Sequence, residues 1–385
     1  MAIVGHTANL SGGELALVRV LPSLLLGGVR VTVVLGEDGP LVAAVAATGA
    51  GVQVLPMRDE VKNRTRADTD SGKKAVKALL PTAAYIGGLS RHLRRLRVDV
   101  VHTNTLKAAL YAGLAGRAAR LPVLWHIRDR IAPDYLPSRT VSLVRAMSRR
   151  VPHRIAVNSR TTAVTLPPGV QHRLHLVPDC VEVPAAMHLV NGGEREAQDT
   201  FTFGMMGRLA PWKGQHVALE AFARACAEDS RLRLIFVGSA MFGEHVYEKT
   251  LRARALELGL DEKVSFRGFQ ADIWREYATF DGAIHASVLP EPFGQVVVEA
   301  MAAGLPVLAS ASGGPSEIID DGINGILVSP GDDIALAQAM ATVAWQPELR
   351  ERLTAAGRET AKNFAPQATS EALTALYQML VRGRR

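Results

Sequence analysis

Short apolar runs alternate with stretches of helical periodicity along the sequence, and this alternation occurs twice. In the first half, strand-sized runs such as Ala2–Gly5, Val29–Leu35 and Val98–His102 are separated by segments whose apolar residues recur every three to four positions. The pattern restarts at Thr202–Gly207, which opens a second series of the same kind. Strands that alternate with helices form βαβ units and a mainly parallel sheet. The sequence therefore predicts an α/β protein with two successive doubly wound domains.

A polar stretch rich in small residues, at 184–200, lies between the two series and is typical of a linker. Domains usually contain about 100–200 residues, so a chain of 385 residues is long enough for two. We predict a first domain over residues 1–185 and a second over residues 186–365. Residues 366–385 are expected to form a helix that packs back toward the first domain.

Charge is divided unevenly between the two halves. Residues 1–185 contain 25 lysines and arginines against 12 acidic residues, whereas the remainder contains 19 against 25. The basic excess is dense between Arg58 and Arg97. A solvated surface, an anionic membrane surface and an anionic small acceptor would each explain it. Nucleic acid is not expected as a partner, because no recognition fold or aromatic-interleaved basic stretch accompanies the charge.

Several observations indicate a cytoplasmic protein. No apolar run approaches the roughly 20 residues that a membrane span needs, and the first residues lack the apolar core of a signal peptide. The two cysteines, Cys180 and Cys226, do not make a disulfide framework and have no metal-type neighbours. Because the first half is basic, peripheral attachment at the inner face of the membrane is kept as an alternative.

Glycines follow the first predicted strand of the first domain. Gly12 and Gly13 separate that strand from a predicted helix. The backbone there can approach a ligand closely, and the helix N-terminus offers N–H groups to a phosphate or a sugar. A turn without a ligand is an equally valid interpretation of this motif alone.

A second motif, Gly207–Gly214, follows the first strand of the second domain. Its Arg208 and Lys213 stand five positions apart across a tight loop, so both side chains can reach one point. A planar guanidinium fork and an ammonium point charge together suit a diphosphate. Ligands of open α/β sheets bind at the carboxyl ends of strands, which is where this loop lies. The alternative is a solvated basic loop.

Two carboxylates lie eight positions apart around the start of a later helix. Glu291 belongs to the proline-stiffened loop Pro290–Gly294, and Glu299 lies more than one turn inside the helix. The first residues of this helix present N–H groups without intrahelical partners. One carboxylate could hold sugar hydroxyls and the other a ribose diol. Helix-dipole stabilisation of an acidic residue would explain Glu291 without a ligand, but not a half-buried Glu299.

These motifs together resemble a known family. Glu291-Pro292-Phe293-Gly294 followed by Glu299-Ala300-Met301, with Gly207-Arg208 and Lys213-Gly214 upstream, is similar to the retaining glycosyltransferases of family 4. Other family motifs are matched at Gly12-Gly13, Pro178-Asp179, Gly304–Val307 and Gly313-Gly314. The resemblance covers nearly the whole chain and is most specific over 204–332. It implies the GT-B fold, in which two Rossmann-like domains face each other across a cleft.

The resemblance also implies roles for the matched residues. Arg208 and Lys213 would neutralise the donor diphosphate, Glu291 would bind hydroxyls of the donor sugar, and Glu299 would hold the ribose of the nucleotide. Backbone atoms near Arg267 would frame the base, and N–H groups at 294–296 would help to cradle the phosphates. The complete set of expected donor-binding residues is Gly12, Gly13, Arg208, Lys213, Arg267, Gly268, Phe269, Glu291, Phe293, Gly294, Gln295, Val296 and Glu299.

His126 follows a strand of the first domain and is expected near the reacting sugar, which makes His126, Arg208, Lys213 and Glu291 the predicted catalytic set. A structural histidine with satisfied hydrogen bonds is the alternative for His126. His102, Asn104 and Arg128 are expected on the acceptor side. No metal ligand is expected, because no histidine cluster accompanies His126 at ligand spacing and the family that the motifs resemble typically binds its donor without a divalent metal. No cofactor is expected beyond the donor itself.

The implied activity is retaining transfer of a hexose-type sugar from a nucleotide diphosphate sugar to an unknown hydroxyl acceptor. UDP is favoured over GDP. A retaining hydrolase uses a carboxylate nucleophile on the face opposite the leaving group, and no second carboxylate is available for that role here. Metal-independent attack from the front face is therefore expected. A nucleotide-sugar epimerase of the GT-B fold and a non-catalytic nucleotide-sugar-binding protein are the alternatives.

Overall fold

The computed structural model describes residues 1–57, 79–183, 200–241 and 243–383. The chain forms two compact units. Unit 1 comprises Met1–Cys180 together with Ala365–Arg385, and unit 2 comprises Val181–Phe364. The predicted boundaries, after residues 185 and 365, lie within five residues of those of the units. Most of the predicted linker, and the basic residues from Arg58 to Lys77, lie outside the described residues.

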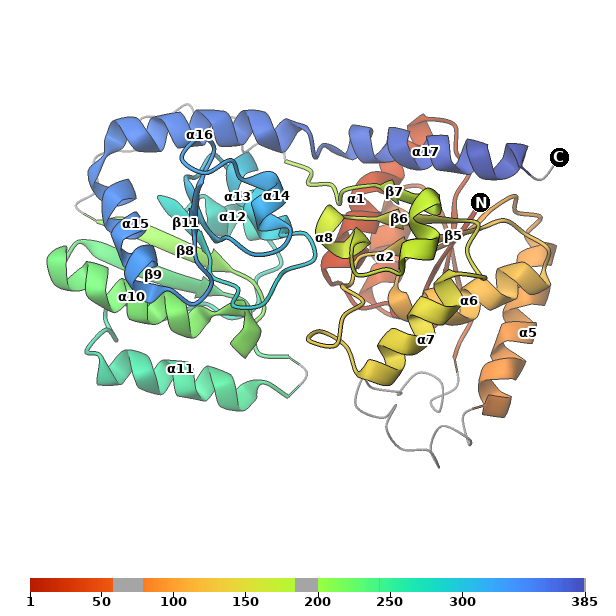
Figure 1. Cartoon of the computed structure of the whole chain (residues 1–385), viewed down its shortest axis with the longest axis horizontal. Helices are drawn as coiled ribbons and strands as arrows, with labels where there is room; N and C mark the ends of the chain where they lie inside the picture. The colour runs from red at the N-terminus through yellow and green to blue at the C-terminus, as the bar shows by residue number, and fades with distance from the viewer. Residues whose placement is uncertain (58–78, 184–199, 242, 384–385) are drawn as a thin grey trace. The chain divides into compact units, whose positions relative to one another are not determined.

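Unit 1 is built on a sheet of seven parallel strands in the order β3-β2-β1-β4-β5-β6-β7 (Figure 1). The strands are β1 (Ala2–Gly5), β2 (Thr32–Leu35), β3 (Gly51–Val54), β4 (Val101–Thr103), β5 (Val123–Ile127), β6 (Arg154–Val157) and β7 (Leu174–Leu176). The helices are α1 (Gly12–Leu26), α2 (Pro40–Ala47), α5 (Leu79–Arg95), α6 (Leu106–Ala118), α7 (Ser138–Ser148), α8 (Arg160–Ala163) and α17 (Pro366–Arg382).

Helices cover both faces of this sheet, so its central strands are apolar on both sides. In β1, Ala2 and Val4 belong to the core formed with α5, α6 and α7, whereas Ile3 between them belongs to the core formed with α1, α2 and α17. This alternation follows from the two-residue period of a strand. It explains why β1 appears in the sequence as an uninterrupted apolar run.

The last helix, α17, belongs to unit 1 and lies alongside α1 (Figure 1). Its Leu373, Leu376 and Leu380 join Leu17 and other residues of α1 in one hydrophobic core. Proline at the first position of α17 is well suited to a helix start, because that N–H has no intrahelical partner. The predicted terminal segment is thus a helix of 17 residues.

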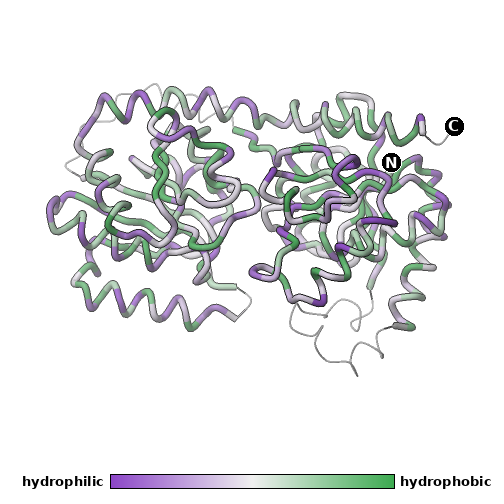
Figure 2. The backbone as a smooth tube through the Cα atoms, viewed as in Figure 1, coloured by the Kyte–Doolittle hydropathy of each residue, from purple (hydrophilic) through white to green (hydrophobic). Residues whose placement is uncertain are grey.

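Unit 2 contains six parallel strands in the order β10-β9-β8-β11-β12-β13. The strands are β8 (Phe201–Met206), β9 (Leu232–Val237), β10 (Val264–Phe266), β11 (Gly282–His285), β12 (Val307–Ser310) and β13 (Ile326–Val328). The helices are α10 (Gln215–Glu228), α11 (His245–Glu257), α12 (Ile273–Tyr277), α13 (Gln295–Ala302), α14 (Pro315–Ile318), α15 (Asp333–Trp345) and α16 (Pro347–Lys362). Figure 2 shows mainly hydrophobic colour along the strands and hydrophilic turns on α11 and α16.

Six neighbouring strands have the same order in each unit. The second and third strands lie on one side of the first strand, and the fourth, fifth and sixth lie on its other side. The order 3-2-1-4-5-6 is that of dinucleotide-binding α/β proteins, and it creates a crevice between the first and fourth strands. In unit 1 this point lies between β1 and β4, and in unit 2 between β8 and β11. The two-domain doubly wound fold predicted from the sequence is confirmed.

Some helices were not anticipated by the sequence pattern. Pro40–Ala47 is apolar almost throughout and therefore shows no helical period. Pro347–Lys362 is strongly charged, and only Leu353 and Gly357 are buried along it, which makes its apolar stripe very narrow. Lys73–Leu96 has apolar residues at a spacing of three to four, which predicts a helix, and the structure describes this helix, α5, from Leu79 onward. Within the described residues, no helix has both the length and the apolar character that a bilayer span needs.

Candidate active site

The crevice of unit 2 is formed by the loops that follow β8 and β11. A backbone hydrogen bond joins these two loops, from the N–H of Val288 to the carbonyl of Trp212 at 2.9 Å. Gly214 ends the first loop with φ +75°, and a Cβ at this position would lie 1.9 Å from the carbonyl oxygen of Ala286 in the second. Glycine is needed here for both reasons. The two loops are thereby held in close backbone contact.

The first loop presents the two predicted cations beside an indole ring. Lys213 Nζ lies 4.5 Å from the centre of the Trp212 ring, and the Arg208 guanidinium carbon lies 5.8 Å from it. Both distances suit cation–π contact. The side-chain amide of Gln215 donates to the Arg208 carbonyl at 2.9 Å and so fixes the start of the loop. Both cations therefore occur on one short, braced loop, as the sequence predicted.

The second loop presents Glu291 at the centre of a buried polar cluster. Lys213 Nζ donates to Glu291 Oε1 at 2.6 Å. The other oxygen, Oε2, lies 2.6 Å from His285 Nε2 and accepts a hydrogen bond from the Ser287 hydroxyl at 2.9 Å. His285 is the last residue of β11, which places its ring at the carboxyl edge of the sheet. Glu291 is thus bound at both oxygens.

These contacts control the ionisation of Glu291. Burial by itself would raise the pKa of this carboxyl, but the charge of Lys213 and the adjacent His285 hold the pKa well below its usual range. Glu291 is consequently an ionised acceptor at neutral pH. Such a group can accept hydrogen bonds from hydroxyl groups, but it cannot serve as a proton donor.

Glu299 lies on α13 and is 5% exposed. Its Oε2 accepts a hydrogen bond from the Tyr277 hydroxyl at 3.3 Å, and its Oε1 accepts one from the side-chain amide of Gln295 at 3.2 Å. Gly294 precedes the helix in the left-handed conformation, with φ +93°. The N-terminal N–H groups of α13 at Gln295 and Val296 are therefore on the same helix as Glu299, one turn earlier.

The other residues predicted for donor binding lie in different surroundings. Gly268 has φ +67°, and its carbonyl accepts from the N–H of Gly238 at 2.8 Å. The Arg267 side chain is directed to Glu276, at 2.6 Å, and Phe269 is 68% exposed. Phe293 is buried and packs edge-on against Phe364. The backbone of 267–268 and the exposed ring of Phe269 are available to a ligand, whereas the Phe293 ring is part of the core.

In unit 1 the predicted acceptor-side residues Asn104 and Arg128 are joined directly. The Arg128 guanidinium donates to the side-chain oxygen of Asn104 at 2.7 Å and to Asp179 at 2.5 Å. The side-chain amide of Asn104 in turn donates to the carbonyl of Gly13 at 3.3 Å. Gly12 and Gly13 are the first two residues of α1. One network therefore links the loops after β1 and β4 of this unit.

The same helix start contains a buried carboxyl. The Ser11 hydroxyl donates to Glu14, which is 4% exposed. Burial raises the pKa of Glu14 above its ordinary value. The N-terminal turn of α1 is therefore lined by a hydroxyl and a weakly acidic carboxyl in addition to its two glycines.

His102 and His126 are both interior residues, each 1% exposed. His102 Nε2 lies 3.2 Å from His126 Nδ1, and the two rings stack with their centres 5.2 Å apart. Burial, together with the charge of Arg128, lowers the pKa of His102 to about 3 and that of His126 well below its ordinary value. Both rings are neutral at pH 7. This burial favours the structural interpretation of His126, and its contact with a donor sugar stays a prediction.

The sequence analysis missed several residues of these networks. His285 and Ser287 hold Glu291, and Tyr277 holds Glu299. Asp179, which the sequence analysis noted only as part of a family motif, holds Arg128. His285 could have been found, because it ends the short run Gly282–His285, which lies directly before the Glu291 loop in the sequence. The metal prediction is not decided by the structure. Across the described ranges, no group of three or more histidine, cysteine or acidic residues is arranged to hold a metal ion.

Comparisons with known proteins extend this description. The family model for glycosyl transferases group 1 matches residues 192–360, and the model for the glycosyl transferase 4-like domain matches residues 11–180. Among curated proteins, the putative glycosyltransferase EpsD of Bacillus subtilis (strain 168) is 34% identical over 180 residues, which are 47% of this chain and 46% of EpsD. D-inositol 3-phosphate glycosyltransferase of Corynebacterium glutamicum (strain R) is 28% identical over 325 residues, 77% of each chain.

Solved structures share the fold over almost the whole chain. Anabaena HepE in complex with UDP and glucose superposes with a TM-score of 0.81 at 24% identity, covering 98% of both chains. Sucrose-phosphate synthase from Thermosynechococcus elongatus gives a TM-score of 0.75 at 19% identity, covering 99% of both chains. The chain spans about half the length of the first curated relatives that it matches.

Two doubly wound units of Rossmann type, with charged residues gathered at the crevice of the second, define a GT-B protein. The two family models match one unit each and together account for most of the chain. The chain belongs to the family 4-type glycosyltransferases of the GT-B fold.

Proposed function

We propose that the protein is a retaining glycosyltransferase that moves a hexose-type sugar from a nucleotide diphosphate sugar to a hydroxyl acceptor, with UDP favoured over GDP. The observation that carries this proposal is the cluster of Arg208, Lys213, Glu291 and His285 at the switch point of unit 2. The family membership supports the reaction class. HepE, solved with UDP-glucose, supports UDP as the nucleotide.

The donor's charge and its hydroxyl groups would be bound by different members of this cluster. Arg208 and Lys213 supply positive charge for the diphosphate, and this charge matters most as the leaving group becomes more negative. Ionised Glu291 accepts hydrogen bonds from sugar hydroxyls. Glu299 accepts from the ribose hydroxyls, and its two present donors, Tyr277 and Gln295, keep its oxygens in place.

The transfer step requires one bond to form and one to break on the same face of the sugar. The acceptor oxygen bonds to the anomeric carbon while the bond from that carbon to the diphosphate oxygen breaks with its electron pair. The acceptor proton passes to the departing diphosphate, so no protein base is needed. Glu291 is bound at both oxygens by Lys213, His285 and Ser287, which supports an orienting role over that of a nucleophile.

The same arrangement supports catalysis without a metal ion. In many nucleotide-sugar enzymes a metal cation balances the charge of the diphosphate. Here Arg208 and Lys213 would supply the positive charge from one loop. Donor binding is therefore expected to persist in the presence of a chelator.

The acceptor is proposed to be anionic. The basic excess of residues 1–185 and the position of Arg128 in the network of unit 1 support this assignment. A relative that covers 77% of the chain is named for D-inositol 3-phosphate, a phosphorylated molecule. We place the enzyme in the cytoplasm, where an acceptor at the inner face of the membrane would also be within reach.

Calorimetric titration with UDP, GDP, ADP and TDP, with EDTA present, tests the donor site. We expect UDP to bind, and we expect Glu299→Gln to weaken its binding by about tenfold or more, because charged hydrogen bonds to the ribose are lost. Glu351→Gln, which changes an exposed carboxylate on α16, is the matched control and should bind UDP normally. If none of the nucleotides binds, the proposal fails.

Product analysis separates transfer from the alternatives. With UDP-glucose and a panel of phosphorylated and neutral acceptors, a transferase forms UDP only when a suitable acceptor is present. NMR of the product should show the anomeric configuration of the donor. An epimerase would interconvert the donor sugar without a second substrate, and a binding protein would leave it unchanged.

A further inference from the structure

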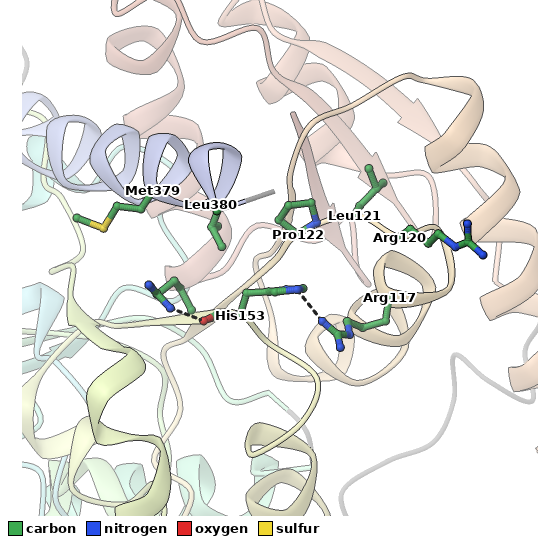
Figure 3. A pocket seen from close by; sticks show the side chains of 9 residues that line it. Arg117, Arg120, Leu121, Pro122, His153, Met379 and Leu380 are labelled. Carbon is green, nitrogen blue, oxygen red and sulfur yellow. Dashed lines mark hydrogen bonds between the residues drawn. The ribbon is translucent and has the colours of Figure 1, made fainter. Parts of the chain in front are cut away.

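A basic pocket of about 500 Å³ lies in unit 1, away from the predicted site residues (Figure 3). It is formed where α6 ends, where β5 and β6 begin, and where α17 ends. Asn104 and His126 lie at the carboxyl ends of β4 and β5, whereas Pro122 and Arg154 lie at or before the amino ends of β5 and β6. The pocket is therefore at the opposite edge of the same sheet.

The lining combines cations with apolar surface. Arg117, Arg120, His153 and Arg154 provide the polar part, and the apolar part consists of Leu121, Pro122, Met379 and Leu380. Figure 3 shows Arg117 and Arg120 on one side and Met379 and Leu380 of α17 on the other. Met379 is 50% exposed, so part of the apolar wall faces solvent. None of the described residues that line the pocket is acidic.

The arginines of the pocket carry charge that no acidic group of the described chain balances. In the described ranges, no salt bridge connects Arg117, Arg120 or Arg154 with a carboxylate. The Arg154 guanidinium donates instead to the carbonyl of His153 at 3.1 Å. Arg120 follows α6 with φ +58°, at a position where glycine is usual. An anion in the pocket would meet several cations whose charge is not otherwise neutralised.

The hydrogen bonds of His153 make its Nε2 a donor that faces the pocket arginines. The N–H of Val123 donates to His153 Nδ1 at 3.0 Å, so Nδ1 carries no proton. In a neutral ring the proton must then be on Nε2. Nε2 lies 2.6 Å from NH1 of Arg117, which is also a donor. The two donors face each other at a distance that leaves no room for an atom between them, and an anionic oxygen beside them would accept from both.

We propose that this pocket binds a phosphate group, at a site separate from the donor site. Arginine forks match phosphate oxygens in geometry and charge, and the N–H of His153 adds a further donor. The proposal does not depend on the proposed transferase activity. The phosphate group could be free in solution or belong to a lipid headgroup, whose chain would then lie along Met379 and Leu121.

Two pairs of substitutions with equal loss of charge test the site in the full-length protein. Arg117→Gln/Arg120→Gln removes two cations of the pocket. Arg95→Gln/Arg150→Gln removes two exposed arginines of unit 1 that do not line the pocket. Inorganic phosphate is titrated at constant ionic strength with chloride as the balancing anion. In parallel, binding is measured to phosphatidylcholine vesicles with and without about one-third phosphatidylglycerol.

For free phosphate, we expect the pocket pair to bind about tenfold or more weakly than the wild type, while the control pair stays close to wild type. For a lipid headgroup, we expect free phosphate to bind negligibly, and binding to the anionic vesicles to fall in the pocket pair and in Met379→Ser. Either pattern supports the site and shows whether its phosphate group is free in solution or belongs to a lipid headgroup. The proposal is overturned if the pocket pair and the control pair behave alike in both arms, since the binding would then be diffuse.

A second measurement does not depend on how well the variants fold. The pKa of His153 is lowered by burial and by the charges of Arg117, Arg154 and Arg173. These cations face the ring from α6, from β6 and from the segment Pro168–Arg173. A bound phosphate favours the charged ring and should raise this pKa, which NMR titration of the wild type can follow with phosphate and with chloride. Identical titration curves in the two salts, together with no response to the anionic vesicles, would contradict the proposal.

Discussion

The hydroxyl of Tyr377, on the last helix of the chain, lies 2.8 Å from Nδ1 of His102, which precedes it by 275 positions. His102 in turn contacts His126, so Tyr377, His102 and His126 are linked in one chain of buried polar side chains. All three are at most 6% exposed. The C-terminal helix therefore contributes a hydrogen-bond partner, in addition to apolar packing, to the strand that ends in His102 and Thr103.

Tyr377→Phe should destabilise the protein by about 1–3 kcal/mol, because it leaves a buried nitrogen of His102 without its partner. Urea denaturation measures the change. Tyr85→Phe is the matched control in the same unit, since the Tyr85 hydroxyl makes only a long contact of 3.4 Å with the Leu55 carbonyl. Equal losses in the two variants would show that the hydrogen bond to His102 contributes little.

Acid should weaken folding through the buried histidines. The folded-state pKa values of His102 and His126 lie below the ordinary value of 6.5, mainly because of burial. The contribution of such a group is fully present above pH 6.5 and is lost as the pH falls toward the folded value. Between these two pKa values, each ring lowers the free energy of unfolding by about 1.4 kcal/mol for every pH unit of acidification.

The free energy of unfolding of the wild type should exceed that of His126→Gln by less at pH 5 than at pH 6.5. Urea denaturation at several pH values measures this difference. His172→Gln changes an exposed ring and serves as the control, whose curve should run parallel to that of the wild type. A constant difference between wild type and His126→Gln across this range would rule out neutral burial of His126.

The sequence predicted the sheet well because each doubly wound sheet is buried on both faces. The strand at Ala2–Gly5 has the bounds that the sequence predicts, since an apolar run before a turn has few other structures available to it. The helices Pro40–Ala47 and Ser138–Ser148 were missed. The first has almost no polar face, and the second buries only Val141, Val144 and Ser148. Periodicity detects a helix only when its two faces differ clearly.

For the candidate site, the sequence identified Lys213 and Glu291 but assigned them to separate parts of a donor. The structure pairs them across 78 positions. This contact forms because β8 and β11 are neighbours in the sheet. The local sequence pattern predicts the strands but not their order. His285, in contrast, precedes Glu291 by only six positions, so its contact with Glu291 does not depend on strand order and was overlooked although it is local. The glycines and prolines around both residues were informative because they report on backbone geometry, which is local.

Glu291→Gln should lower both stability and donor binding at pH 7. The carboxylate is buried and accepts from Lys213 and His285, so its removal leaves Lys213 without a counter-charge, at a cost of about 3 kcal/mol. Because the folded-state pKa of Glu291 is depressed, its contribution is present above its ordinary value of 4.5 and is lost as the pH falls below it. The stability difference between wild type and variant should therefore narrow from pH 6 to pH 3. A difference that stays constant would mean that Glu291 is not charged in the folded protein.

Gly214→Ala should separate the two loops of the crevice. Its Cβ would lie 1.9 Å from the carbonyl oxygen of Ala286, in addition to the penalty of a left-handed conformation at φ +75°. Gly259→Ala isolates that penalty, because Gly259 has φ +67° and a Cβ there meets nothing within 4 Å. We expect Gly259→Ala to cost about 1 kcal/mol and Gly214→Ala about 3 kcal/mol or more. UDP binding should weaken only in Gly214→Ala, since Trp212 and Lys213 would shift with the loop. Similar losses of stability in the two variants, with UDP binding intact, would show that the close approach of the two loops does not hold the cations in place.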